Sequence, residues 1–170
     1  MSTMSTATWS RAMAVVVVGA AAIALSGCSM LQGLIGGEGV VEGEGESTDV
    51  FSLAVGDCLN DLDANGEVSA VPKVECSEPH DSEVYLSVIM EDGEFPGAEA
   101  ITTASEEGCL GAFDSFVGAP YETSLVDYNY YQPTESTWAA GDREILCIVM
   151  EYDANGEPVK TVGSLAGTGK

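Results

Sequence analysis

Residues Pro96–Val117, PGAEAITTASEEGCLGAFDSFV, have helical periodicity and are the basis for the fold prediction. Small and apolar residues recur there at spacings of three and four, which places them on one helix face: Ile101, Ala104, Gly108, Ala112 and Phe116. Cys109 and Phe113 lie alongside this face. Pro96 stands near the expected start, and Gly118-Ala119-Pro120 ends the pattern. The segment is therefore predicted to be a helix with one buried face.

Segments on both sides of this helix have the composition of β-strands. Val84–Met90 alternates and is rich in β-forming residues, while Glu144–Tyr152 places Ile145, Cys147 and Val149 on one face. Further strands are expected around Val68–Cys76, around Leu125–Tyr131, and through Val159 and Val162. This order predicts an α+β fold, a small and mostly antiparallel sheet with one principal helix packed on it.

The first 27 residues have the organisation of an export signal. Arg11 precedes an uncharged run, Ala12–Leu25, which is short for a bilayer span of about 20 residues. Leu25-Ser26-Gly27-Cys28 resembles the lipobox of bacterial lipoprotein precursors, in which the cysteine sulfur is lipidated and the chain is cut before it. This resemblance implies a signal peptide at 1–27, lipidation at Cys28 and an anchor in the outer face of the cell membrane. A retained transmembrane segment is the alternative.

Residues 28–50 are rich in Gly and Glu, as in Glu42-Gly43 and Glu44-Gly45-Glu46. Glycine makes ordering costly and the carboxylates repel one another, so this segment is interpreted as a flexible tether that does not pack. The folded domain is accordingly expected to cover residues 51–170, which is enough chain for one compact domain.

The 170-residue chain is strongly acidic, with 28 Asp and Glu against five Lys and Arg and a formal net charge of −23. Every acid follows Cys28 and Arg11 precedes it, so removal of residues 1–27 leaves 28 acids against 4 bases, or −24. Nucleic acid and anionic lipid both favour Lys and Arg, so neither is an expected partner. A solvated acidic surface and attraction of cations both remain compatible with this charge.

Four cysteines remain besides Cys28, an even number that favours two disulfides in an exported protein: Cys58, Cys76, Cys109 and Cys147. No Cys-x-x-Cys pair occurs, and the spacing of Cys58, Cys76 and His80 matches no compact zinc motif. Four cysteines allow three pairings. Placement favours Cys58–Cys76 across a turn-containing segment and Cys109–Cys147 between helix and sheet.

Asp61-x-Asp63-x-Asn65-Gly66 matches the first half of a calcium-binding loop, in which alternate oxygens surround the cation. Its twelfth position is Pro72, which supplies no carboxylate. The segment is interpreted as a turn, because Asn-Gly readily adopts positive φ, and calcium binding is the alternative. No metal or cofactor is assigned to the chain.

His80 is the only histidine. Acid–base catalysis requires a second group positioned beside it, and sequence neighbours rarely supply that geometry. Pro79-His80-Asp81 is interpreted as a turn whose imidazole satisfies a backbone group. The chain is not expected to be an enzyme.

Aromatic residues gather between residues 128 and 138. Tyr and Trp are favoured at binding surfaces because they add large contact area at small entropic cost. The candidate binding patch therefore comprises Tyr128, Tyr130, Tyr131, Trp138 and Arg143. On a strand Tyr128 and Tyr130 face one way and Tyr131 the other, so packing in the core is the alternative. Arg143 is expected to form an ion pair or to stack on Trp138.

An ordered set of motifs between Val55 and Leu165 resembles the septum formation domain. The matching residues are Val55-Gly56-Asp57-Cys58, Val74, Cys76, Pro79-His80, Glu83-Val84, Cys109, Phe113, Phe116-Val117-Gly118, Pro133-Thr134, Trp138, Gly141-Asp142-Arg143, Cys147 and Gly163-Ser164-Leu165. The family occurs on membrane-tethered proteins of Gram-positive bacteria. The resemblance implies a role in cell-division septation and supplies no catalytic residues or ligand.

These observations favour a non-enzymatic interaction module of the cell envelope. The expected protein is a lipoprotein on the outer face of the membrane that contacts an envelope or division protein. The alternative is a ligand-binding or cation-binding surface lipoprotein, which the acidity and the Asp61 loop favour.

Overall fold

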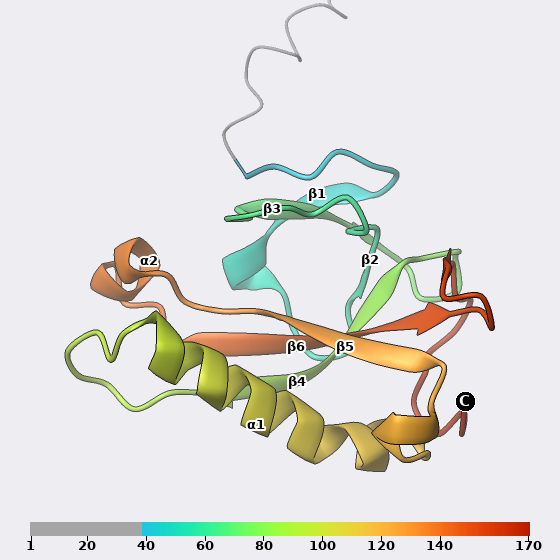
Figure 1. Ribbon diagram of the computed structural model, residues 1–170. Helices are drawn as coiled ribbons and strands as arrows, with labels where there is room; N and C mark the ends of the chain where they lie inside the picture. The colour runs from blue at the N-terminus through green and yellow to red at the C-terminus, as the bar shows by residue number, and fades with distance from the viewer. Residues whose placement is uncertain (1–38) are drawn as a thin grey trace, which may run out of the picture. The chain divides into compact units, whose positions relative to one another are not determined.

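The computed structural model describes residues 39–170, which form an α+β fold (Figure 1). The predicted signal peptide 1–27 and the predicted lipidation site Cys28 lie outside the described residues. Among the helices within 39–170, none has the length and apolar character needed to cross a membrane.

A curled antiparallel sheet forms the centre of the fold. Its strands are β1 (Glu46–Asp49), β2 (Cys58–Leu59), β3 (Ala70–Val74), β4 (Ser82–Ile89), β5 (Val126–Tyr131), β6 (Glu144–Tyr152) and β7 (Pro158–Val159). The order is β1-β3-β2-β4-β6-β5, with β7 beside β6, and every strand pair is antiparallel. Within residues 39–170, the α-helices α1 (Ala98–Val117) and α2 (Glu135–Ala139) and the short 3₁₀ helices η2 (Val50–Ser52) and η3 (Tyr121–Thr123) complete the fold. The predicted fold class is confirmed.

Strand β6 divides the interior into two cores because successive side chains of a strand point to opposite faces. Its residues Ile145, Cys147 and Val149 pack with Phe113 of α1 in the first core. Leu146 and Ile148 pack on the opposite face in the second core, which also contains Val41, Val50, Leu53, Leu59, Val71 and Val84. Figure 1 shows α1 lying across one side of β4, β5 and β6, with β1 and β3 on the other side.

The buried stripe of α1 follows a spacing of four: Ile101, Ser105, Cys109, Phe113 and Val117. Ala104, Ala112 and Phe116, which the sequence placed on the buried face, lie partly buried beside it. A β-carbon at Gly108 would lie 2.9 Å from Cγ2 of Val88, so this position admits the close approach of α1 to β4. Gly118, at φ +82°, ends the helix in the left-handed conformation.

Two disulfides connect these elements, with the predicted pairing. Cys58–Cys76 joins β2 to the segment after β3, with a Cα–Cα distance of 5.2 Å. Cys109–Cys147 joins α1 to β6 across the first core, with a Cα–Cα distance of 5.5 Å. The stapling of helix to sheet that the sequence predicted is confirmed.

The packed part of the chain begins earlier than expected. Val41 donates a 2.9 Å backbone hydrogen bond to Ala70, Val50 donates one of 3.1 Å to Ser69, and both valines are buried. Strand β1 lies between them and pairs with β3. The interpretation of the whole of 28–50 as an unpacked tether is therefore wrong for residues 39–50.

Glycine, which suggested disorder in this segment, has a structural role there. Gly45 has φ +137°, and a β-carbon at this position would lie 2.7 Å from the backbone oxygen of Lys73. Only a residue without a side chain allows β1 to approach β3 in this conformation. The same composition that predicts flexibility is thus also the composition that this close packing requires.

Candidate functional site

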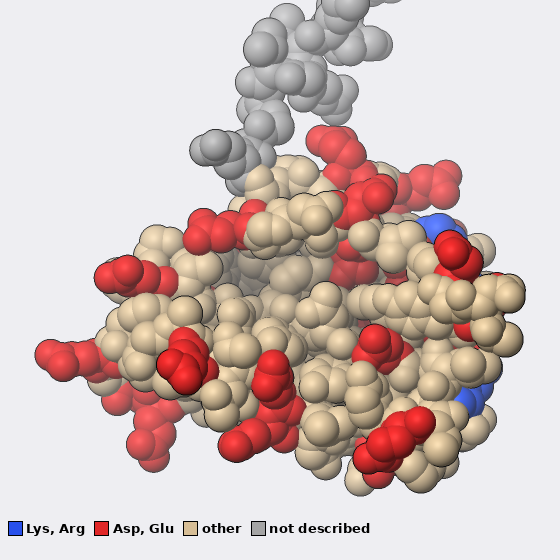
Figure 2. Space-filling model, viewed as in Figure 1, with Lys and Arg blue, Asp and Glu red and all other residues tan. Residues whose placement is uncertain are grey.

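A cleft of about 420 Å³ opens between the two ends of the curled sheet. Val50 and Phe51, directly after β1, and residues 66–69, before β3, form one side. The end of β5, the α2 region and the start of β6 form the other side. Figure 2 shows this hollow below the β1–β3 layer. Because β1 and β5 are the two ends of the strand order, the curl of the sheet is what brings these segments together.

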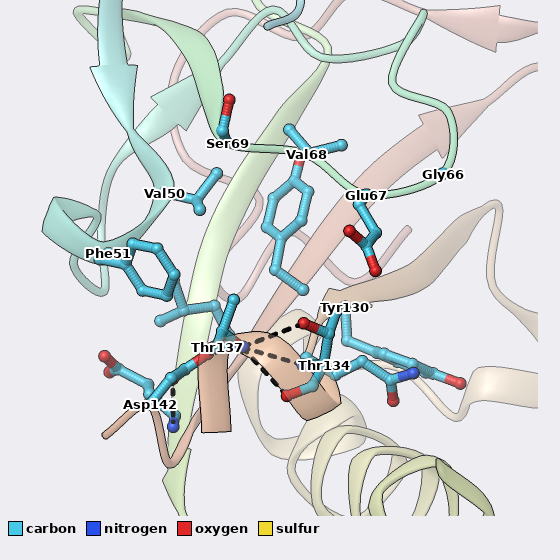
Figure 3. Close-up of a pocket in the computed structure, with 14 residues that line it drawn as sticks. Val50, Phe51, Gly66, Glu67, Val68, Ser69, Tyr130, Thr134, Thr137 and Asp142 are labelled. Carbon is cyan, nitrogen blue, oxygen red and sulfur yellow. Dashed lines mark hydrogen bonds between the residues drawn. The ribbon is translucent and has the colours of Figure 1, made fainter. Parts of the chain in front are cut away.

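Apolar side chains form part of the cleft. Val50 and Leu146 are buried, whereas Phe51 is 58% exposed. Figure 3 shows Val50, Phe51 and Val68 on the upper side of the cleft, facing the α2 side. An exposed aromatic ring beside buried aliphatic residues offers apolar contact area to a ligand.

The α2 wall of the cleft is held by its own hydrogen bonds. Thr134 caps α2, because its Oγ1 accepts from the Thr137 amide at 3.2 Å and its amide donates to Thr137 Oγ1 at 2.9 Å. Thr137 Oγ1 also donates to Asp142 Oδ2 at 2.9 Å, and Asp142 Oδ1 accepts from the Glu144 amide at 3.0 Å. Glu144 in turn accepts a hydrogen bond from Ser87. Asp142 and Glu144 are therefore committed to holding the wall.

Glu67 differs from these acids. Its side chain is exposed and makes no hydrogen bond or ion pair with any residue of the described chain. Figure 3 shows its carboxylate directed into the cleft, on the Tyr130 side. It is thus the carboxylate of the cleft that is available to a ligand.

A hydrogen bond connects one side of the cleft to a buried carboxylate. Tyr131, which lines the cleft, donates a 2.5 Å hydrogen bond from its hydroxyl to Asp61 Oδ2, and Ser82 Oγ donates to Asp61 Oδ1 at 2.6 Å. Burial is the largest effect on this carboxyl and raises the pKa of Asp61, although both hydrogen bonds act in the opposite direction. Burial likewise raises the pKa of Tyr131.

The free edge of β5 runs into the cleft at Tyr130. Leu125 accepts a backbone hydrogen bond from Tyr152, which fixes the residues of β5 whose backbone groups bond to β6. These are every second residue, so the backbone amides of Tyr128 and Tyr130 point away from β6. The Tyr128 amide donates instead to Asp127 Oδ1, and the Tyr130 amide donates to Asn129 Oδ1, both at 2.8 Å. The outward amides of Tyr128 and Tyr130 are therefore satisfied by side chains of the same strand, and that of Val126 donates to Ser124 Oγ at 2.9 Å.

The five residues of the predicted binding patch lie in three places. Tyr128 and Tyr130 pack against the first core, as expected for one face of β5. Tyr131 packs against the second core. Tyr128 also contacts the ring of Tyr121, at 5.3 Å between centroids. Only Tyr130 and Tyr131 of the five line the cleft.

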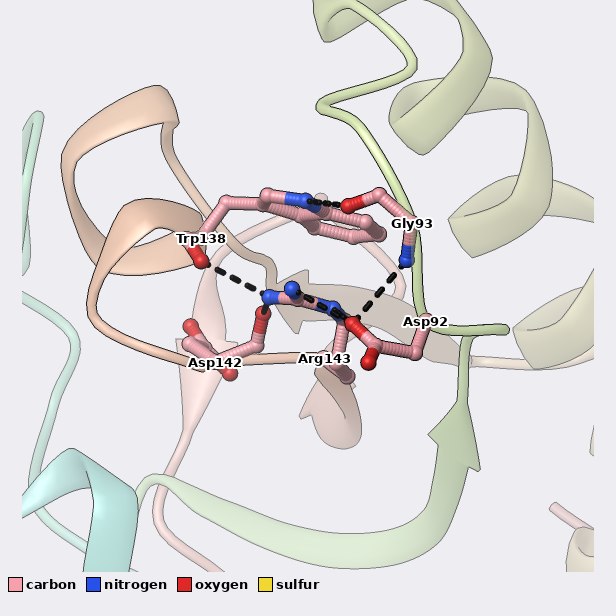
Figure 4. Close-up of polar contacts among 5 residues, drawn as sticks. All are labelled: Asp92, Gly93, Trp138, Asp142 and Arg143. Atoms are coloured by element: carbon pink, nitrogen blue, oxygen red, sulfur yellow. Dashed lines mark hydrogen bonds and ion pairs between the residues drawn. The ribbon is translucent and has the colours of Figure 1, made fainter.

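Trp138 and Arg143 form a separate clamp between α2 and the loop after β4 (Figure 4). The Arg143 guanidinium lies 3.9 Å from the Trp138 ring centroid and donates to Asp92 Oδ1 at 2.8 Å. Trp138 Nε1 donates to the Gly93 carbonyl at 3.0 Å. The hydrogen bond from Arg143 is the largest of the effects that lower the pKa of Asp92. The predicted ion pair and stacking of Arg143 are both confirmed, and Trp138 is buried.

Two other candidates lie outside the cleft. His80 is fully buried, its Nδ1 lies 2.8 Å from the Glu78 carbonyl oxygen, and its Nε2 has no partner among residues 39–170. In the Asp61–Gly66 segment, which was predicted to be a turn with calcium binding as the alternative, Asp61 is buried against Ser82 and Tyr131 whereas Asp63 is exposed. Within the described chain no group of three or more acidic, histidine or cysteine side chains could hold a metal ion.

Acidic residues in the described chain far outnumber the basic residues that could pair with them. Each of its four basic residues is in an ion pair: Lys73 with Asp57, Arg143 with Asp92, Lys160 with Asp81 and Lys170 with Glu151. The remaining carboxylates have no basic partner within residues 39–170. Figure 2 shows acidic residues spread over the face that contains the cleft.

Sequence reasoning missed Phe51 and Glu67. Phe51 lies at the expected start of the folded domain, where an apolar residue gives no sign of binding a ligand. Glu67 is one of 28 acidic residues, and its residue type alone does not distinguish it from the others. The Asn65-Gly66 turn before Glu67 was the available signal, because turn residues are surface residues that are free to contact a ligand.

Comparison with known proteins gives one match. The family model described as septum formation matches residues 55–170. No curated protein and no solved structure matches the chain significantly.

Proposed function

The chain belongs to the septum formation family, and from this premise we propose that it acts in septum formation as a non-enzymatic interaction module of the cell envelope. A lipid on Cys28 holds it at the outer face of the cell membrane. An envelope or division protein binds in the cleft beside Phe51. The observation that carries this proposal is the cleft itself, which offers an exposed aromatic ring and an uncommitted carboxylate on a disulfide-linked frame.

The engagement of the other polar groups favours binding over catalysis. Acid–base chemistry needs a proton-transferring group within reach of a substrate. In the cleft, Asp142 and Glu144 hold neighbouring groups, and Tyr131 donates to the buried Asp61. His80 is buried and does not line the cleft. A rigid wall with an accessible apolar ring is instead typical of a recognition surface.

The anchor rests on the lipobox at Leu25–Cys28 and on the charge of the chain. A chain with a formal charge of −24 after removal of residues 1–27 is repelled by anionic lipid headgroups, so it needs a covalent anchor to remain at a membrane. Two disulfides fit an oxidising compartment outside the cytoplasm.

Site-specific photo-crosslinking in dividing cells tests this proposal. A photoreactive residue at position 51 is compared with one at position 162, where Val162 is 65% exposed and does not line the cleft. We expect a crosslink to one defined envelope or division protein from position 51 alone, and we expect a fluorescent fusion to concentrate at the septum. Cys28→Ala should abolish fatty-acid labelling and release the protein from the membrane. Uniform distribution of the wild type, or equal crosslinking at both positions, would contradict the proposal.

A further inference from the structure

We propose that the cleft binds an extended peptide segment carrying both basic and apolar side chains, which pairs along the free edge of β5. This inference rests on the proposed function, because it specifies the chemistry of the partner at the same cleft. Three observations carry it: the open edge of β5, the exposed ring of Phe51, and the unmatched acidity around the cleft.

The edge of β5 can accept another strand without movement of its backbone. The outward amides of Tyr128 and Tyr130 donate to the side chains of Asp127 and Asn129, the residue before each one in the chain, and Asp127 Oδ1 also accepts from the Tyr121 hydroxyl at 2.8 Å. Asn129 is exposed, and a rotation of its side chain frees the Tyr130 amide. An added strand would replace these side-chain acceptors with its own carbonyl oxygens, and the existing hydrogen bonds between β5 and β6 would remain in place.

Alternate side chains of such a strand would project into the cleft because a strand has a period of two. Phe51, Val68 and the buried Val50 offer them an apolar surface. An apolar residue at every second position of the bound segment fits this surface. Phe51 is then covered, and burial of an exposed aromatic ring is a frequent source of binding energy at interfaces.

Charge selects a basic partner. The four basic residues of the described chain are already paired with carboxylates, whereas Glu67 is uncommitted and faces the cleft. Lys or Arg in the partner would be attracted to the acidic face as a whole, and a basic residue at one of the cleft-facing positions would meet Glu67. A second copy of the chain is a poor occupant, because two chains of the same strong negative charge repel each other.

The test uses the full chain extracted from membranes in non-ionic detergent, together with synthetic peptides. The probe is a fluorescent nine-residue peptide in which Lys and Val alternate, except that one Val is replaced by Lys so that a basic side chain also faces the cleft, and its binding is followed by anisotropy. Three matched peptides replace Lys by Glu, replace Val by Ser, or methylate every second backbone nitrogen so that one edge of the peptide cannot donate. We expect binding of the Lys/Val peptide and at least tenfold weaker binding of each of the other three.

Variants of the protein locate the site. Phe51→Ala should weaken binding about tenfold, the factor that corresponds to loss of an interface aromatic. Glu67→Gln should weaken it about two- to fivefold, as expected for one exposed ion pair. Val162→Ala and Glu78→Gln, both exposed and outside the cleft, serve as matched controls and should bind as the wild type does.

Each alternative result overturns a stated part of the inference. Equal weakening by Glu78→Gln and Glu67→Gln means general attraction to an acidic protein rather than a site. Unchanged binding of the methylated peptide rules out pairing along β5, and failure of the Lys/Val peptide to bind overturns the partner chemistry. If position 51 still crosslinks to a division protein in cells, the proposed function stands and only this inference fails. If the peptide binds but position 51 captures no such protein, the inference about the cleft stands and the proposed function fails.

Discussion

The hydroxyl of Tyr131 lies 2.5 Å from Oδ2 of Asp61, a residue 70 positions earlier in the chain. This contact joins the end of β5, which lines the cleft, to the segment after β2. It therefore links the edge strand β5 to the segment after β2 within the curled sheet. Because the Asp61 carboxyl is buried, the contact also makes the stability of the fold sensitive to pH.

Asp61→Asn should flatten the dependence of stability on pH. Burial raises the folded-state pKa of Asp61 above its ordinary value of 3.8, so the folded chain holds this proton more tightly than the unfolded chain does. The stabilising contribution is fully present below pH 3.8 and is lost as the pH rises through the folded-state pKa. Each unit of difference between the two pKa values corresponds to about 1.4 kcal/mol.

Urea unfolding at intervals from pH 4 to pH 8 measures this effect. Asp63→Asn is the matched control, because Asp63 is exposed and two residues away. The wild type and the control should lose stability relative to Asp61→Asn across this window. Parallel curves for wild type and Asp61→Asn would show that Asp61 does not titrate differently in the folded state.

A chain that starts at residue 51 should be less stable than one that starts at residue 39. The shorter chain lacks β1 and the buried Val41 and Val50, and burial of one valine contributes about 1.5 kcal/mol or more. We expect a loss of about 3 kcal/mol in the free energy of unfolding, measured with urea. Limited proteolysis of the full chain should likewise stop near residue 39, and a stable product that starts at residue 51 would contradict the packing of β1.

Arg143→Lys should destabilise the fold by about 1–2 kcal/mol. Lysine keeps the charge but cannot stack its head group on Trp138 while it also donates to the Trp138 and Asp142 carbonyls. Asp92→Asn should change stability little, because the Asp92 side chain is 89% exposed. Thermal unfolding of both variants distinguishes the contacts, and a larger effect from Asp92→Asn would show that the ion pair dominates the clamp.

Loss of the Cys109–Cys147 disulfide should cost more than loss of Cys58–Cys76. The two bridges span 38 and 18 residues, which corresponds to about 4 and about 3 kcal/mol of unfolded-state entropy. Cys109 and Cys147 are both fully buried in the first core, whereas only Cys58 of the other bridge is fully buried, so removal of Cys109–Cys147 leaves the larger cavity. Double Cys→Ala variants, compared by urea unfolding, measure both losses. Equal midpoints would contradict both the loop effect and the effect of burial.

Periodic segments of the fold could be predicted from the sequence. The range predicted for β6, Glu144–Tyr152, is the range found, and α1 begins two residues after the predicted Pro96. Periodicity also supports the choice of Cys109–Cys147 among the possible pairings, because it places Cys109 beside the buried face of the helix and Cys147 on the buried face of a strand, whereas the choice of Cys58–Cys76 rests on the turn-containing segment between them. Where periodicity is the basis, the signal is a repeating pattern of buried side chains within one segment.

Residues 39–50 and the cleft could not be predicted in this way. Gly45 is required by positive φ and by close approach to Lys73, yet in the sequence it is indistinguishable from a linker glycine. The cleft combines side chains from separate segments, which only the curl of the sheet brings together. The aromatic residues near 130 pointed to its β5 side, but Phe51 and Glu67 carry no pattern of their own.

Complementation of septation tests the central claim most directly. In cells that lack the wild-type protein, a lipidated Phe51→Ala/Glu67→Gln double variant is compared with a Val162→Ala/Glu78→Gln double variant at equal membrane abundance. Septum frequency and cell length are measured by microscopy. The account predicts that the control restores normal septation and that the cleft variant does not. Full restoration by the cleft variant would contradict the assignment of the cleft as the contact surface.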